Sequence, residues 1–81
     1  MAKTRAELVD GLAERAGVPT LTAGETEAIL ALAAVAAHGT GDRTSAPLVS
    51  FLAGLSAANA DDRTQALDSF RRLAAELAPE Q

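Results

Sequence analysis

The chain has 81 residues, of which 48% are hydrophobic, and it contains two Phe but no Trp, Tyr or Cys. The absence of cysteine excludes disulfides and thiolate metal sites, and a single histidine argues against a zinc site. The formal net charge of −4 disfavours nucleic-acid binding, because affinity for the phosphate backbone comes mainly from Lys and Arg.

Ala and Leu make up most of the apolar residues, and both are strong helix formers. We therefore expect a single all-α domain over residues 1–81, folded as a compact four-helix bundle with short loops. So short a chain buries only a small core, and sharing an apolar face with a second copy would enlarge it. A homodimer is the expectation that follows.

The first helix is predicted over residues 5–16. Thr4 and Glu7 have the spacing of a capping box, in which each side chain accepts a hydrogen bond from the backbone amide of the other residue. Gly17 and Pro19 supply the left-handed cap and the stop. One apolar face of this helix carries Leu8, Val9, Leu12, Ala13 and Ala16.

The second helix is predicted over residues 23–38. Thr22 and Glu25 repeat the capping box, and Gly39 is predicted to take the left-handed conformation that closes a helix. The stretch from Ala28 to Ala37 carries no charge, and a helix that is apolar all round must be surrounded by other elements. We therefore expect this helix to be the central one.

The third helix is predicted over about residues 47–59 and is expected to start at Ser45 or Ala46. Pro47 belongs to its first turn, where a missing amide N–H costs nothing. Its apolar stripe consists of Leu48, Phe51, Leu52 and Leu55. Gly54 lowers helix propensity by ~1 kcal/mol relative to Ala, so its presence predicts a close helix–helix crossing at that point.

The fourth helix is predicted over residues 62–78, with Asp61 as its cap. Asp68 and Arg72 have the spacing of an exposed ion pair one turn apart. The residues expected to be buried on this helix are Ala66, Leu67, Phe70, Leu73, Ala74 and Leu77.

The loop between the second and third helices holds the candidate binding residues, His38, Arg43, Thr44 and Ser45. Arg43 beside the amino end of a helix would suit a phosphate or carboxylate group. The simpler interpretation is structural, because Ser and Thr commonly cap helix starts and a histidine suits the negative end of a helix dipole. Both interpretations stay open at this point, and we predict no catalytic and no metal-binding residue.

Membrane association is not expected from the sequence. The charge-free run from Ala28 to Ala37 is shorter than the ~20 residues that a membrane span needs. The N-terminal residues contain no apolar stretch of the signal-peptide type. The expected location is cytoplasmic.

A family resemblance rests on Leu32, Ala33, Ala37, His38, Gly39, Arg43, Ala46, Pro47, Leu48, Phe51, Leu52, Gly54 and Leu55. In this pattern the chain resembles an actinobacterial family of small domains of unknown function. A similar segment also occurs beside molybdopterin-guanine dinucleotide biosynthesis nucleotidyltransferases. The similarity covers about Leu8 to Ala58, and His38, Arg43, Pro47 and Phe51 carry most of it.

The resemblance implies a setting, molybdenum-cofactor maturation, and it implies no activity. The chain lacks the glycine-rich nucleotide-binding segment of the transferases themselves. We therefore expect a small non-catalytic accessory or protein-interaction domain without a cofactor, whose partner is a molybdenum-cofactor biosynthesis protein or a second copy. The alternative is a small-molecule or anion-binding module that uses the loop from His38 to Ser45 and the start of the third helix.

Overall fold

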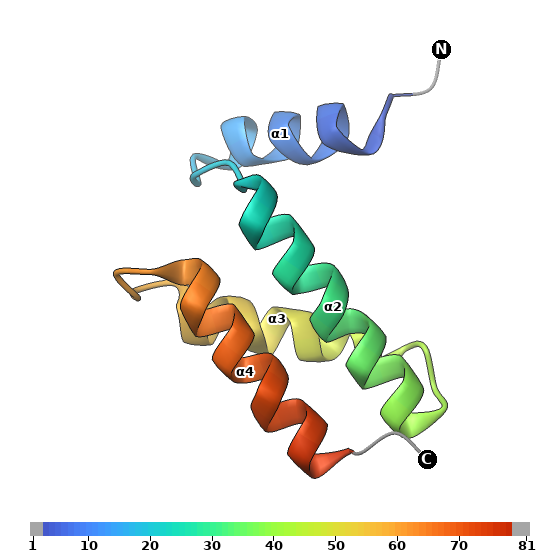
Figure 1. The fold of residues 1–81 in the computed structure, drawn as a ribbon. Helices are drawn as coiled ribbons and strands as arrows, with labels where there is room; N and C mark the ends of the chain where they lie inside the picture. Colours follow the sequence, from blue (N-terminus) through green and yellow to red (C-terminus); the bar gives the residue numbers. More distant parts are fainter. Residues whose placement is uncertain (1–2, 79–81) are drawn as a thin grey trace.

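The computed structural model describes residues 3–78 and contains four helices with short connections. They are α1 (Arg5–Ala16), α2 (Ala23–Thr40), α3 (Ser45–Ala57) and α4 (Arg63–Leu77), shown in Figure 1. No strand occurs within these described residues. The predicted all-α fold with four helices is confirmed.

Capping boxes start α1 and α2, as the sequence predicts. The Thr4 hydroxyl accepts a hydrogen bond from the Glu7 amide at 3.1 Å, and the Glu7 carboxylate accepts one from the Thr4 amide at 3.0 Å. Thr22 and Glu25 form the same pair of bonds at 3.1 and 2.8 Å. These bonds satisfy amides that have no partner inside the helix, so they fix where each helix begins.

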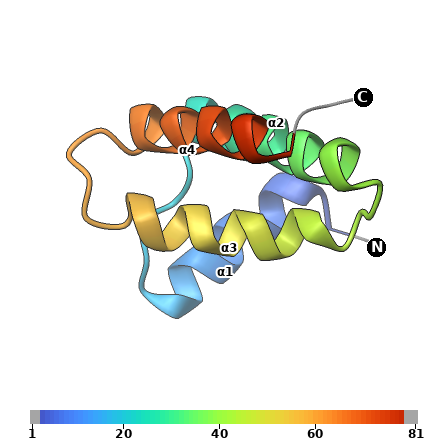
Figure 2. The same ribbon diagram turned by 90° about the horizontal axis from the view of Figure 1, so that it is seen from below.

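The helices form two layers. Figures 1 and 2 show α2 and α4 side by side in one layer, running in the same direction, with α3 crossing them in the other layer. Within residues 3–78, helix-to-helix contacts join α2, α3 and α4, whereas α1 lies apart, on the same side of α2 as α3. The molecule measures 39 × 34 × 17 Å, so it is only about two helices thick.

A small core lies where α2, α3 and α4 meet. Its buried members are Leu32, Ala53, Ala57 and Leu67, and the side chains packed against them are Ala28, Ile29, Val49, Ala66, Phe70 and Ala74. Leu32 is the one large side chain of the described residues that is fully buried. As predicted, α2 packs against both other helices of the core. Its Leu30 side chain is nevertheless about half exposed, so α2 is not surrounded on all sides.

The predicted end of α2 at His38, with Gly39 as the cap, is wrong by two residues. The helix continues to Thr40, and Gly41 takes the left-handed conformation, with a φ of 72°. Thr40 explains the extension, because its hydroxyl donates to the Ala36 carbonyl at 2.8 Å and accepts from the Asp42 amide at 3.1 Å. Both glycines could have served as the cap, and these two bonds favour the later one.

The close approach predicted at Gly54 occurs at Gly39 instead. A Cβ atom added to Gly39 would meet the Ala78 carbonyl oxygen and would lie 2.8 Å from the Ala78 Cβ. A Cβ added to Gly54 would meet no atom within 4 Å. Gly39 is therefore the glycine that lets the end of α4 approach α2, and Gly54 faces open space.

α3 begins at Ser45, one of its two predicted starts, because a turn bonding the Ser45 amide to the Asp42 carbonyl leads directly into the helix. It ends at Ala57 instead of residue 59, and α4 spans Arg63–Leu77 instead of 62–78. Pro47 stays within the first turn, as predicted. α4 begins at Arg63, and its cap is Asp62 rather than Asp61, since the Asp62 carboxylate accepts from the Gln65 amide at 3.1 Å.

Candidate functional site

The apolar stripe of α3 faces away from the rest of the molecule. Leu48, Phe51, Leu52 and Leu55 are 68%, 69%, 55% and 60% exposed, and we call these four residues the α3 outer stripe. Their spacing of three, four and seven residues places them on one side of the helix. Side chains of this size normally occupy a core, so this surface is the most unusual feature of α3.

α3 is apolar on both sides, and its smaller side chains face inward. Ala53 and Ala57 are buried against α2 and α4, and Val49 packs beside them. Small inward residues let α3 lie close to the other layer, while the larger residues point outward. The helix contains no charged residue at all. A helix with two apolar faces is normally covered on both, and α3 is covered on one side only.

A groove of about 240 Å³ continues this apolar surface towards α4. Its wall on the α3 side includes Leu52, and its wall on the α4 side includes Leu73 and Leu77. The predicted burial of these two α4 residues is wrong, since Leu73 is half exposed and Leu77 is largely exposed. On the last turns of α4, Ala74 packs against the core and Ala78 approaches Gly39, whereas Leu73 and Leu77 line the groove and stay exposed.

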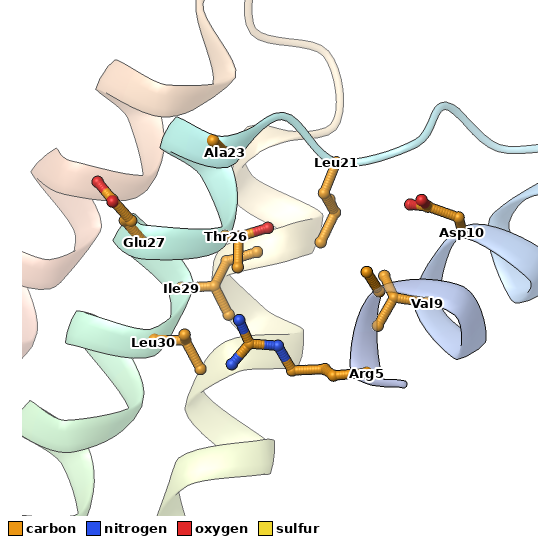
Figure 3. A pocket seen from close by; sticks show the side chains of 10 residues that line it. Arg5, Val9, Asp10, Leu21, Ala23, Thr26, Glu27, Ile29 and Leu30 are labelled. Atoms are coloured by element: carbon orange, nitrogen blue, oxygen red, sulfur yellow. The ribbon is translucent and has the colours of Figure 1, made fainter. Parts of the chain in front are cut away.

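A second opening, of about 470 Å³, separates α1 from the first half of α2. Figure 3 shows Val9 of α1 facing Leu21, while Arg5 extends across the opening towards Leu30 of α2. The opening exists because α1 makes no close packing contact with the other helices. Leu12, on the predicted apolar face of α1, is 60% exposed.

The loop that was predicted as a candidate anion site is organised around Asp42. The Asp42 carboxylate accepts hydrogen bonds from the Thr44 amide at 2.9 Å and from the Thr44 hydroxyl at 2.6 Å. The Ser45 hydroxyl lies 2.9 Å from the Thr40 hydroxyl. Thr44 and Ser45, two of the candidate residues, are thus brought together in a hydrogen-bonded turn.

The backbone amides at the start of α3 are also paired within this turn. The Ser45 amide donates to the Asp42 carbonyl, the Ala46 amide donates to the Arg43 carbonyl, and Pro47 has no amide hydrogen. An anion site at a helix start depends on unpaired amides and a positive local potential. Here the amides are paired and a carboxylate already lies among them, which favours a structural role for the loop. The expected side-chain cap is absent, because Thr44 precedes α3 without donating or accepting a cap bond there.

His38 and Arg43, the other two candidates, are both exposed; His38 lies in the last turns of α2, and Arg43 lies within this turn. Two hydrogen bonds from Thr44 lower the pKa of the Asp42 carboxyl below its ordinary value, and the bond from the Thr44 hydroxyl has a larger effect than the bond from the amide. Asp42 therefore carries its negative charge throughout the neutral range. That charge opposes the binding of a second anion beside Arg43.

One important polar contact was missed by sequence reasoning. Glu25 is 3% exposed, and Arg63, at the start of α4, donates to its Oε1 at 3.1 Å and also pairs with its Oε2. Glu25 was predicted only as the capping partner of Thr22, and no spacing signal links residues so far apart in the chain. The ion pair ties the beginnings of α2 and α4 together.

Within residues 3–78 there is no cluster of three or more His, Asp or Glu side chains arranged to hold a metal ion. None of the helices in that same range combines the length and the apolar character required to traverse a lipid bilayer.

A family model described as Domain of unknown function (DUF6457) matches residues 2–81. The chain belongs to this family. The DUF6457 match covers α4 as well as the earlier helices, so it extends beyond the segment from Leu8 to Ala58 that carried the sequence resemblance. Comparison of this DUF6457 chain with curated proteins and with solved structures found no match.

Proposed function

We propose that the protein is a non-catalytic protein-interaction module and that it binds its partner through the α3 outer stripe. The observation that carries this proposal is the outward orientation of four large apolar side chains on a helix without charge. Exposed apolar patches of this kind mark interaction surfaces, because burying them on a partner removes apolar area from water.

Two further features support a protein as the ligand. Phe51 is one of only two aromatic residues in the chain, and it lies in the middle of the stripe with 69% of its surface exposed. Aromatic side chains are enriched at the centres of protein interfaces. The groove between Leu52 and Leu77 lies beside it and is lined almost entirely by apolar atoms, so it suits a side chain of a partner better than a charged metabolite.

The setting that we propose is molybdenum-cofactor maturation in the cytoplasm, with an accessory role beside a biosynthesis enzyme. This part of the proposal rests on the sequence resemblance described above.

The test is affinity capture from the native host with three baits, followed by identification of the captured proteins. The baits are the wild type, Leu55→Asp in the α3 outer stripe, and Leu12→Asp on α1 as the matched control. Leu55 and Leu12 are the same residue type and are both 60% exposed, so the two variants differ only in location.

We expect the wild type and Leu12→Asp to retain the same protein, and Leu55→Asp to lose it. A captured molybdenum-cofactor biosynthesis protein would support the proposed setting. Equal capture by all three baits would overturn the assignment of the surface to α3.

A further inference from the structure

We propose that the partner bound by the α3 outer stripe is a second copy of this chain, with the two stripes packed together about a twofold axis. This inference rests on the proposed function, because it names the occupant of the same surface. It requires that the surface be complementary to itself, as every twofold interface is.

The charge distribution favours a second copy. The chain has a formal net charge of −4, so two copies repel one another wherever charged surfaces meet. α3 is the one helix of residues 3–78 without any Asp, Glu, Lys or Arg. When two copies pair through α3, the facing helices carry no charges. This pairing therefore avoids the repulsion between like charges that the other helices would cause. The same lack of charge leaves the stripe without the ionic groups that would select a charged partner.

The amount of exposed surface also fits. The chain has an accessible surface of 6034 Å². A compact monomer of its mass, 8.2 kDa, is expected to expose about 4500 Å². The excess of roughly 1500 Å² includes the uncovered side of α1 as well as the α3 outer stripe. Pairing through α3 would cover the part that belongs to the stripe.

The core of one copy is small, and the outer side of α3 has no second layer packed against it. Leu32 of α2 is the single large side chain that is fully buried in the described residues, and the two buried residues that α3 contributes to the core are alanines. A second α3 against the outer stripe would enclose Phe51 and three leucines from each copy. This pairing places α3 between two apolar layers, so that both of its apolar faces are covered.

The groove beside the stripe gives the interface a defined shape. It opens between α3 and α4 next to Leu52, so apolar side chains from the facing stripe can enter it. A bulky residue that fills an apolar groove restricts the orientation of the two copies more than a flat contact does. The twofold arrangement provides two such grooves, one on each copy.

The experiment measures mass by sedimentation equilibrium and light scattering, with purified chains from about 1 µM to about 500 µM, because a dimer dissociates on dilution. The wild type is expected to reach twice the 8.2-kDa chain mass. Leu55→Asp is expected to raise the dimer dissociation constant at least about 100-fold, because each interface contains the substitution twice. The matched control Leu12→Asp is expected to leave the dissociation constant within about threefold of the wild type.

Circular dichroism of each variant checks that its helices are intact. If Leu55→Asp loses helical signal, Phe51→Ser replaces it in the same measurement. A wild-type chain that stays monomeric at the highest concentration would overturn the inference, as would equal weakening by Leu55→Asp and Leu12→Asp. A monomeric chain that still captures a host protein through Leu55 would refute the second copy as partner while leaving the proposed function intact.

Discussion

Removing Arg63 tests whether the ion pair with Glu25 holds α2 and α4 together. Arg63→Ala leaves the Glu25 carboxylate, which is 3% exposed, with the Thr22 amide as its remaining donor at 2.8 Å. Loss of one member of a fully buried ion pair costs about 3–5 kcal/mol, because the other charge stays buried without compensation. The Arg63 side chain is 32% exposed and the Thr22 bond persists, so we expect a smaller loss of about 2 kcal/mol.

For a domain of this size, a loss of ~2 kcal/mol corresponds to a decrease in melting temperature of roughly 8–16 °C. The matched control is Arg72→Ala, which also removes an ion pair from α4. Arg72 contacts Asp68 at 2.9 Å, but its side chain is 71% exposed. Surface pairs one turn apart contribute only about 0.3–0.5 kcal/mol, so the control should melt within about 4 °C of the wild type.

The assay is thermal unfolding followed by circular dichroism at one fixed protein concentration and neutral pH. Glu25→Gln completes a double-mutant cycle, and Arg63→Ala should cost much less in that background because the carboxylate is already gone. The reasoning fails if Arg63→Ala melts within about 2 °C of the wild type, or if the effects of the two substitutions simply add.

Three further predictions concern individual residues. Gly39→Ala should lower the melting temperature, because overpacking against the end of α4 costs about 1–3 kcal/mol. Gly54→Ala should raise the melting temperature through a gain of ~1 kcal/mol in helix propensity. The opposite order of the two melting temperatures would contradict the assignment of the close contact to Gly39. Because folding lowers the pKa of the Asp42 carboxyl, its negative charge stabilises the folded state. This stabilisation is fully present above the ordinary pKa near 3.8 and is lost as the pH falls through the lower pKa of the folded protein. The difference in melting temperature between wild type and Asp42→Asn should therefore shrink from pH 7 towards pH 2.5, and a constant difference would show that the charge plays no part. Millimolar phosphate should leave the melting temperature unchanged, and a rise that Arg43→Ala abolishes would establish the anion-binding alternative.

Local signals allowed much of the fold to be predicted. The capping pairs Thr4–Glu7 and Thr22–Glu25 act within three residues, so their effect can be read directly from the sequence. The bounds of α1 were therefore predicted without error. The end of α2 was missed because the hydroxyl of Thr40 decides between two glycines, and the sequence offers no way to rank them.

The candidate site could be predicted only in part, because it depends on which face of a helix meets the core. The outer stripe of α3 was identified as apolar, but its orientation follows from the fit of Ala53 and Ala57 against α2 and α4. One signal in the sequence was available: α3 has two apolar faces and no charge. A single core covers only one face of a helix, so one apolar face had to stay exposed. The Glu25–Arg63 pair could not be predicted, since its partners come together only when the helices pack.

Because α2 and α4 run in the same direction, they cannot form a helical hairpin with each other, and α3 has to bring the chain back between them. The segment between them must first cross back from the end of α2 to its beginning, and Glu25 meets Arg63 only after this loop of 38 residues has closed. Contacts so distant in sequence slow folding relative to helical proteins that rely on neighbouring contacts. During synthesis, Leu67 of α4 joins the core only after α2 and α3 have left the ribosome. The apolar surfaces of α2 and α3 are therefore exposed in the nascent chain until α4 emerges, and it is in this interval that the protein is most open to aggregation or to capture by a chaperone.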